Sequence, residues 1–239
     1  MKSLAFFALS AFAAAAMAAG PVSPGKITIA LGATSVQSAT FNAVTVSNKS
    51  NTDNTAMQNI SSNAGNIDIK GKSEQNTVAT LGGSMTNESA GKDDFANQNI
   101  SSNAGKVTIS SGGKSTQATG SVNSNVTNLA SGGNATALQN LASNNGDGIV
   151  ISGTSSQGVA LLNTTVSNKA NGSDARATQN MSSNFGDVIV AGSSTQTTYV
   201  TGGSISNLAN GSKSHAIQNI ASNDACDTPR DPCPDCHRY

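Results

Sequence analysis

The feature that most constrains this chain is a unit that recurs five times at nearly constant spacing. The string Gln-Asn-apolar-(Ser/Ala)-Ser-Asn begins at Gln58, Gln98, Gln139, Gln179 and Gln218. The spacings between these glutamines are 40, 41, 40 and 39 residues. Because units of this length stack on their neighbours to bury a shared core, the spacing predicts a repeat architecture.

The rest of the unit can be aligned around this string. Each copy opens with Gly and a short run in which Val or Ile alternates with polar residues, as in GKITI from Gly25. A Ser-x-Gln triplet follows and ends at Gln37, Gln75, Gln117, Gln157 and Gln196. An apolar-(Ser/Thr)-Asn triplet comes next and ends at Asn48, Asn87, Asn128, Asn168 and Asn207. Period-two alternation predicts strands, and the intervening Gly and Asn predict tight turns. We therefore expect an all-β fold, a β-solenoid of five stacked repeats of about 40 residues over residues 25–223.

In such a stack, equivalent residues lie above one another at about 4.8 Å. Buried amides are costly unless their donors and acceptors are paired, and a column of identical amides pairs them. The expected amide ladders, which would also direct assembly, are the Gln58 set (Gln58, Gln98, Gln139, Gln179, Gln218), the Asn59 set (Asn59, Asn99, Asn140, Asn180, Asn219), the Asn63 set (Asn63, Asn103, Asn144, Asn184, Asn223) and the Gln37 set (Gln37, Gln75, Gln117, Gln157, Gln196).

Small apolar residues recur in the same way and should form the buried apolar core of the stack. The two expected columns are Ile60/Ile100/Leu141/Met181/Ile220 and Val46/Met85/Val126/Val166/Ile205. Stacked like charges would repel, so we expect charge to be scarce and confined to loop positions such as Lys92, Asp93, Asp94, Asp174 and Arg176. A 40-residue layer has a contour of roughly 130 Å at ~3.3 Å per residue. It must therefore fold back in several β-arcs or make two rungs per copy, and the pattern leaves both open.

Composition argues against an ordinary globular enzyme. Hydrophobic residues make up 36% of the chain and aromatics 3%, with no Trp, which is too little for a conventional core. Charged residues make up 11% and balance to a formal net charge of zero, which gives no electrostatic attraction for nucleic acid or anionic lipid. No Ser-His-Asp arrangement, phosphate-binding Gly loop or pair of carboxylates in an apolar setting is identifiable. We expect no catalytic residues and no nucleic-acid partner.

The amino terminus is typical of a secretory signal peptide. A basic start at Lys2 precedes an apolar run from Leu4 to Ala16, and Ala16 and Ala18 place small residues before a cleavage site at Ala19. The alternative is a membrane anchor, but the run is shorter than the ~20 residues that span a bilayer. We expect residues 1–18 to be the signal peptide and 19–24 the mature amino-terminal segment. The product would be secreted to the extracellular space or cell surface through the periplasm, without stable membrane insertion.

Residues 224–239 differ in composition and form an expected Cys/Pro-rich tail. They contain Cys226, Cys233, Cys236 and His237, and three prolines that exclude regular structure. One hypothesis is a Cys233–Cys236 disulfide or redox dithiol, with Cys226 left for intermolecular linkage. A second is haem c attachment at Cys233-Pro-Asp-Cys236-His237, and a third is zinc bound by the three cysteines and His237. We expect no cofactor and no metal, with haem c or zinc as the alternatives; His215 stands alone in a loop and should be solvated.

The amide-rich strings NATALQ at Asn134 and GSDARATQN at Gly172 are similar to units of bacterial functional amyloids. Together with the signal peptide and the carboxy-terminal Cys233-Pro234-Asp235-Cys236, the chain resembles the secreted Fap fibre subunits and, more distantly, curlin. Its five units follow one another without the long variable linkers of the major Fap subunit. The resemblance implies a structural subunit of an extracellular amyloid fibre in a biofilm matrix. It also implies partners in a dedicated export machinery and in minor fibre subunits.

Other interpretations of the repeats remain. A disordered linker would not keep amide and apolar positions in register. A closed, monomeric β-solenoid could serve as an adhesin or spacer. A redox or haem c protein could carry its chemistry in the tail. Unpaired backbone on the end layers favours self-association into fibres.

Overall fold

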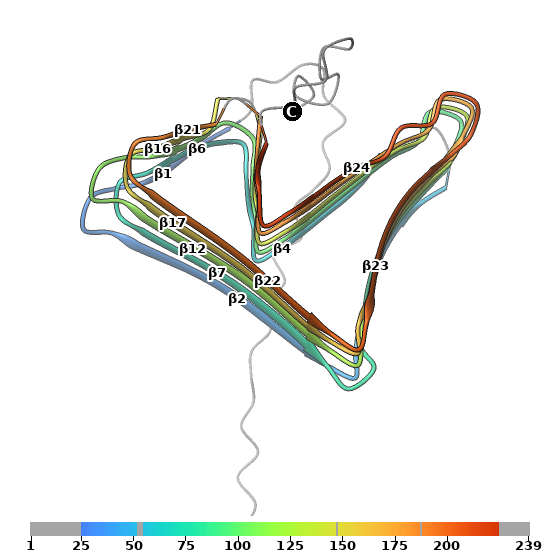
Figure 1. Ribbon diagram of the computed structural model, residues 1–239, viewed down its shortest axis with the longest axis horizontal. Helices are drawn as coiled ribbons and strands as arrows, with labels where there is room; N and C mark the ends of the chain where they lie inside the picture. Colours follow the sequence, from blue (N-terminus) through green and yellow to red (C-terminus); the bar gives the residue numbers. More distant parts are fainter. Residues whose placement is uncertain (1–24, 52–54, 147, 187, 225–239) are drawn as a thin grey trace, which may run out of the picture.

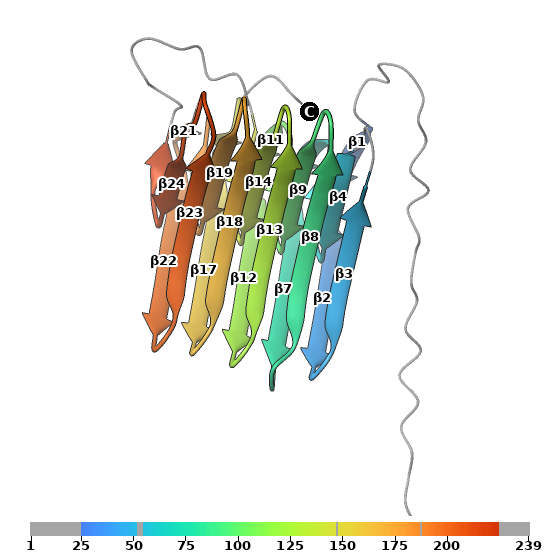
Figure 2. The same cartoon turned by 90° about the vertical axis from the view of Figure 1, so that its right-hand side faces the viewer.

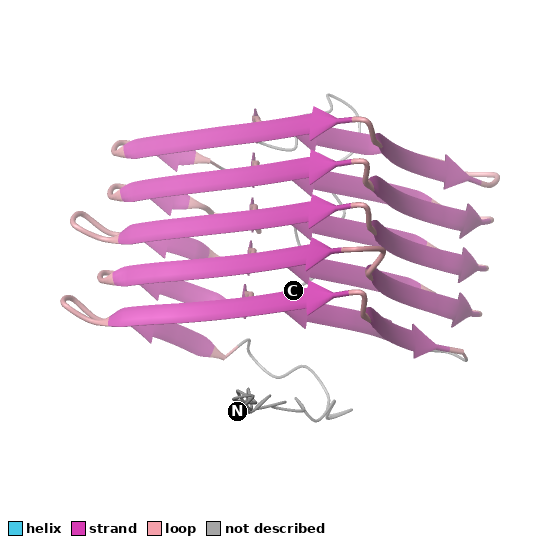
Figure 3. Ribbon diagram, turned by 90° about the horizontal axis from the view of Figure 1, so that it is seen from below, coloured by secondary structure: helices cyan, strands magenta, loops and turns pink. Residues whose placement is uncertain are grey.

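The computed structural model describes residues 25–51, 55–146, 148–186 and 188–224. In these residues the chain winds into five stacked turns, and every regular element is a β-strand. Viewed along the stacking axis, the turns superimpose and trace one folded outline (Figure 1). From the side they lie next to one another as parallel layers (Figures 2 and 3). The predicted all-β solenoid of about 40 residues per repeat is confirmed.

Each turn contributes one strand to each of five series. The first series is β1 (Lys26–Ile29), β6 (Asn66–Ile69), β11 (Val107–Ile109), β16 (Val150–Ile151) and β21 (Ile189–Val190). The second is β2 (Thr34–Asn42), β7 (Lys72–Thr80), β12 (Lys114–Val122), β17 (Thr154–Leu162) and β22 (Ser193–Thr201). The third is β3 (Thr45–Ser50), β8 (Ser84–Gly91), β13 (Asn125–Gly132), β18 (Thr165–Gly172) and β23 (Ser204–Asn210).

The last two series carry the Gln-Asn string and the corner after it. The fourth is β4 (Thr55–Ile60), β9 (Phe95–Ile100), β14 (Thr136–Leu141), β19 (Arg176–Met181) and β24 (Ile217–Ile220). The fifth is β5 (Asn63–Ala64), β10 (Asn103–Ala104), β15 (Asn144–Asn145), β20 (Asn184–Phe185) and β25 (Asn223–Asp224). Each copy therefore makes one rung that folds back through β-arcs, which decides the question that the contour length left open.

Strands of successive turns pair in parallel and without register shift, except that the fifth series is divided into two sheets between β15 and β20. Gln58 lies opposite Gln98, and Ile60 lies opposite Ile100. Both predicted apolar columns are present, because their members are register partners from turn to turn. Each sheet is a stack of equivalent strands, so its inner face repeats the same kind of side chain along the axis.

The corner between the fourth and fifth series explains the small residue at position four of the string. Ser61, Ser101, Ala142, Ser182 and Ala221 all have φ near +50°. This left-handed conformation disfavours bulky or β-branched side chains. The serine that follows closes the corner: Ser102 Oγ lies 2.9 Å from Ile100 O and 3.1 Å from Asn140 O, and its single proton is shared between these two acceptors.

Three apolar clusters lie inside the folded outline, whose arms are the strand series. The largest joins the second, third and fourth series around Ile100, Met85 and Leu161. A second is built from the isoleucine and valine columns of the first series. The third consists of buried alanines between the third and fourth series, such as Ala130 and Ala137. Alanine there lets the two arms approach closely, since a larger side chain would need more room.

The expectation that charge is confined to loops is wrong. Lys49, Lys72, Glu74, Glu88 and Lys114 all lie on strands. Their side chains are exposed or half-buried, so water screens them. Lys49 pairs with Glu88 of the next turn at 2.8 Å, and Lys72 pairs with Glu74 at 2.6 Å. Lys72 and Lys114 are register partners, so even like charges stack where the position faces solvent.

Candidate assembly interface

The Gln58 set forms a continuous ladder on the inner side of the fourth series. Gln98 Nε2 donates to Gln58 Oε1 at 2.8 Å, and Gln139 Nε2 donates to Gln98 Oε1 at 2.8 Å. Gln179 and Gln218 continue the chain of bonds at 2.6 Å each. Each glutamine therefore donates to the turn before it. The central members are fully buried, so the ladder satisfies amides that would otherwise be costly.

The Asn59 set forms a second ladder with the same direction, on the opposite side of the same strands. Asn99 Nδ2 donates to Asn59 Oδ1 at 2.9 Å, and Asn140 donates to Asn99 at 2.7 Å. Asn180 and Asn219 each donate to the preceding member at 2.9 Å. Alternation along a strand separates the two ladders, because neighbouring residues point to opposite faces.

The Asn63 set forms a third ladder, which runs the other way. Asn63 Nδ2 donates to Asn103 Oδ1 at 2.9 Å, and Asn103 donates to Asn144 at 2.9 Å. Asn144 donates to Asn184, and Asn184 to Asn223, both at 2.8 Å. Here each asparagine donates to the turn after it.

A fourth ladder was not among the predicted ones. Asn48 Nδ2 donates to Asn87 Oδ1 at 2.7 Å, and the bonds continue through Asn128, Asn168 and Asn207 at 2.9 Å each. This ladder also runs toward the later turns. The recurring Asn of the apolar-(Ser/Thr)-Asn triplet was the sequence signal that could have identified it.

The Gln37 set does not form a ladder, which corrects the prediction for Gln37, Gln75, Gln117, Gln157 and Gln196. These residues are register partners, but their amides bond across the turn to the Asn63 set. Gln75 Nε2 donates to Asn103 Oδ1 at 3.0 Å and to Ser102 O at 3.2 Å. Gln75 and its acceptors Ser102 and Asn103 belong to the same turn, so this amide is paired within a turn and not between turns.

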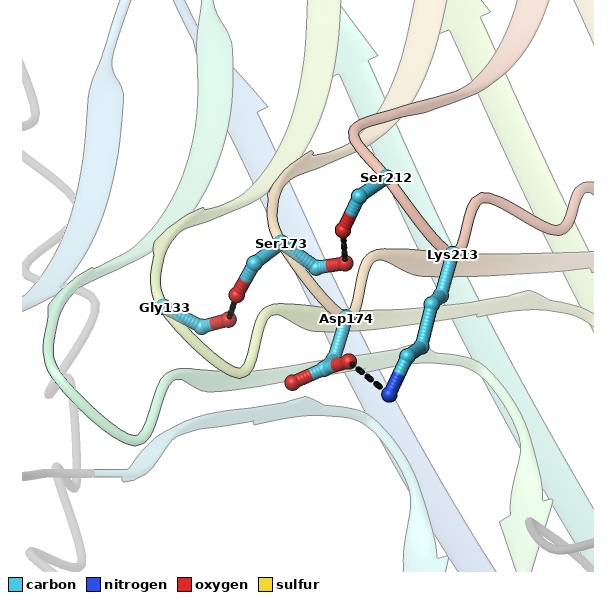
Figure 4. A network of polar contacts seen from close by, with 5 residues as sticks. All are labelled: Gly133, Ser173, Asp174, Ser212 and Lys213. Atoms are coloured by element: carbon cyan, nitrogen blue, oxygen red, sulfur yellow. Dashed lines mark hydrogen bonds and ion pairs between the residues drawn. The ribbon is translucent and has the colours of Figure 1, made fainter.

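The arc between the third and fourth series carries a further polar column (Figure 4). Ser173 Oγ donates to Gly133 O of the preceding turn, and Ser212 Oγ donates to Ser173 O. Beside them, Lys213 pairs with Asp174 at 3.3 Å. Contacts between turns thus continue into the loops, where opposite charges meet.

Within the described part of the chain, the sheets are open at the two end turns. β1, β2, β3 and β4 at one end have a strand neighbour on one side only, as have β21, β22, β23 and β24 at the other. Ile220 and Val190 are each 39% exposed on the last turn, whereas Ile100 and Ile151 in the same columns are fully buried. Unpaired parallel edges above exposed core residues can accept a further layer of the same kind.

The predicted tail chemistry lies outside the described residues: Cys226, Cys233, Cys236 and His237 all belong to the undescribed carboxy-terminal part. The predicted signal peptide and residues 19–24 also lie outside the described residues. His215 is exposed in the loop before β24. Across the described ranges, no three His, Cys, Asp or Glu side chains gather as metal ligands. No helix in the described part of the chain has the length and apolarity needed to cross a membrane.

No protein-family model, curated protein or solved structure matches the chain. The resemblance to Fap subunits and curlin therefore stays a prediction from the repeats and the tail.

Proposed function

We propose that this protein is a structural subunit that polymerises by stacking its end turns into extracellular amyloid-type fibres. The observation that carries the proposal is the pair of open end turns. Among the described residues, each presents backbone with no strand neighbour on its outer side and four columns of amides that end there. A second copy supplies the same strands with the same spacing, so it satisfies these groups in the way that the neighbouring turn does inside the chain.

The side chains that line the stack support this role. Asn, Gln, Ser, Thr, Val and Ile each pack favourably on their own kind, and the formal net charge of zero removes long-range repulsion between copies. In the proposed setting the chain is exported to the biofilm matrix, with the export machinery and minor fibre subunits as partners. It acts as a scaffold and carries no catalytic chemistry.

Fibre diffraction on the purified protein tests the proposal. We expect fibres that grow with concentration and give a meridional reflection near 4.8 Å and an equatorial one near 10 Å. A protein that stays monomeric at high concentration for days would refute it and favour the monomeric adhesin or spacer.

A further inference from the structure

We propose that copies join head to tail in one orientation, with turn five of one copy against turn one of the next. We propose further that the four amide ladders set this orientation. The inference rests on the proposed function and specifies the contact between two stacked copies, which we call the joint. It is drawn from the directions in which the ladders donate.

The first turn offers two donors and two acceptors to a neighbour. Among the described residues, Gln58 Nε2 bonds only to Thr86 O and Asn59 Nδ2 has no acceptor. Asn63 Oδ1 accepts from Gln37 but has, in the described ranges, no counterpart of the second donor that Asn103 Oδ1 receives from the turn before it. Asn48 Oδ1 likewise receives no bond from a described residue, whereas Asn87 Oδ1 accepts one from Asn48.

The fifth turn offers the complementary set. Within the described ranges, Gln218 Oε1 and Asn219 Oδ1 have no donor, although Gln179 Oε1 and Asn180 Oδ1 each accept a bond from this turn. Asn223 Nδ2 has no acceptor in the same part of the chain. Among the residues that the structure describes, Asn207 Nδ2 bonds only to backbone carbonyls, whereas Asn168 Nδ2 also reaches the next asparagine. Head-to-tail contact therefore continues all four ladders, because each donor meets an acceptor.

The apolar columns fit the same joint. Ile220 of one copy would lie on Ile60 of the next, and Val190 on Ile29, as equivalent residues do between turns. Lys213 and Asp224 are the described charged residues of turn five. They do not share a column with Lys26 or Lys49, the described charged residues of turn one. As far as the described residues go, the joint thus buries apolar area without opposing like charges.

The reversed orientation does not fit. Turning a copy over converts its outline into the mirror image, and the outline in Figure 1 has no mirror symmetry. The arms would then lose register and the strands would run antiparallel to their neighbours. A head-to-tail contact uses different surfaces on the two copies and does not close, so it produces an open filament with two distinct ends.

Thiol pairing tests the orientation. Thr45 and Ser204 are exposed members of one column, and hydroxyls in this column approach closely, at 3.0 Å between Ser84 Oγ and Thr45 Oγ1. The full chain is prepared with Cys226, Cys233 and Cys236 changed to Ser, and carries either Thr45→Cys or Ser204→Cys. After fibres form and are oxidised, we expect disulfide-linked dimers in a mixture of the two variants and none in either variant alone.

The outcomes separate the inference from the proposed function. Dimers within the Thr45→Cys sample alone, or within the Ser204→Cys sample alone, would overturn the head-to-tail joint while leaving fibre formation intact. Fibres without a mixed dimer would overturn it as well. Absence of fibres from the parent chain with its native cysteines would instead refute the proposed function.

A second variant tests the role of the ladders. Asn59→Asp keeps the acceptor for Asn99 but replaces the free donor with an oxygen that faces Asn219 Oδ1 of the neighbour. Elongation should slow by about tenfold or more at pH 7, because two acceptors then meet across the joint. Asn42→Asp is the matched control, since Asn42 is exposed on the same turn and only accepts a bond from Thr80. Equal slowing by both variants would show that the added charge, and not the interrupted ladder, lowers the rate of elongation.

Discussion

Asn103 donates its side-chain amide to Oδ1 of Asn144 across 2.9 Å, and neither residue has any exposed surface. This bond between turns is typical of the molecule, whose interior is built from polar columns as much as from apolar ones. The stability of the fold should therefore depend strongly on single buried amides.

Asn144→Ala should lower the free energy of unfolding by about 3 kcal/mol. The change removes the acceptor of Asn103 and Gln117 and the donor to Asn184, which leaves buried polar groups unpaired. Urea unfolding of fibre-free protein measures this loss of unfolding free energy. Asn42→Ala, at an exposed position, should cost less than about 0.5 kcal/mol, and equal losses would contradict the special cost of the ladder.

Gly105→Ala should destabilise the chain by at least about 2 kcal/mol. Gly105 has φ of +118°, and a Cβ there would lie 2.3 Å from the backbone oxygen of Gly65 in the preceding turn. The layer spacing leaves no room for relaxation. Gly158→Ala is the matched control on a strand, where no heavy atom lies within 4 Å of the added Cβ. Comparison of thermal midpoints decides the point; similar midpoints for the two variants would argue against close contact at Gly105.

Asp94→Asn should raise the free energy of unfolding by about 1 kcal/mol. Asp94 Oδ2 accepts from Gly91 N at 3.1 Å, but Oδ1 is buried and has no partner among the described residues. Oδ1 and Gly91 O both lie within 2.0 Å of the point that a Cβ on Gly132 would occupy, so two acceptors face each other. An amide nitrogen in place of Oδ1 could donate to that carbonyl. Asp93→Asn, an exposed neighbour, should change stability little, and a loss of stability in Asp94→Asn would show that the carboxylate is needed.

The ion pair between Lys49 and Glu88 should contribute little. Its side chains are 55% and 27% exposed, so water and salt screen the 2.8 Å contact. A double-mutant cycle with Lys49→Met and Glu88→Gln should give a coupling below about 1 kcal/mol that shrinks in high salt. A larger, salt-insensitive coupling would mean that surface charge helps to hold the first two turns together.

Much of the architecture follows from spacing. Parallel in-register stacking places residue i on its equivalent one repeat later, so the column of Ile60, Ile100 and Leu141 could be predicted from alignment of the repeats. The same argument identified the Gln58 ladder. The argument failed for Gln75. Alignment of the repeats shows which residues are neighbours between turns, but not which residues meet within one turn, where Gln75 bonds to Asn103.

The sequence by itself determined that equivalent residues stack and which amides share a column, because the repeat length and the strand period leave one register. Only the tertiary structure decided the path of each layer and the direction of each ladder. An amide carries both donor and acceptor, so Asn99 and Asn103 have the same capacity in the sequence, yet the first donates to the turn before it and the second to the turn after it. For Asn103 the orientation follows from partners in the second series, because Oδ1 accepts from Gln75 and Nδ2 donates to Ser115 Oγ.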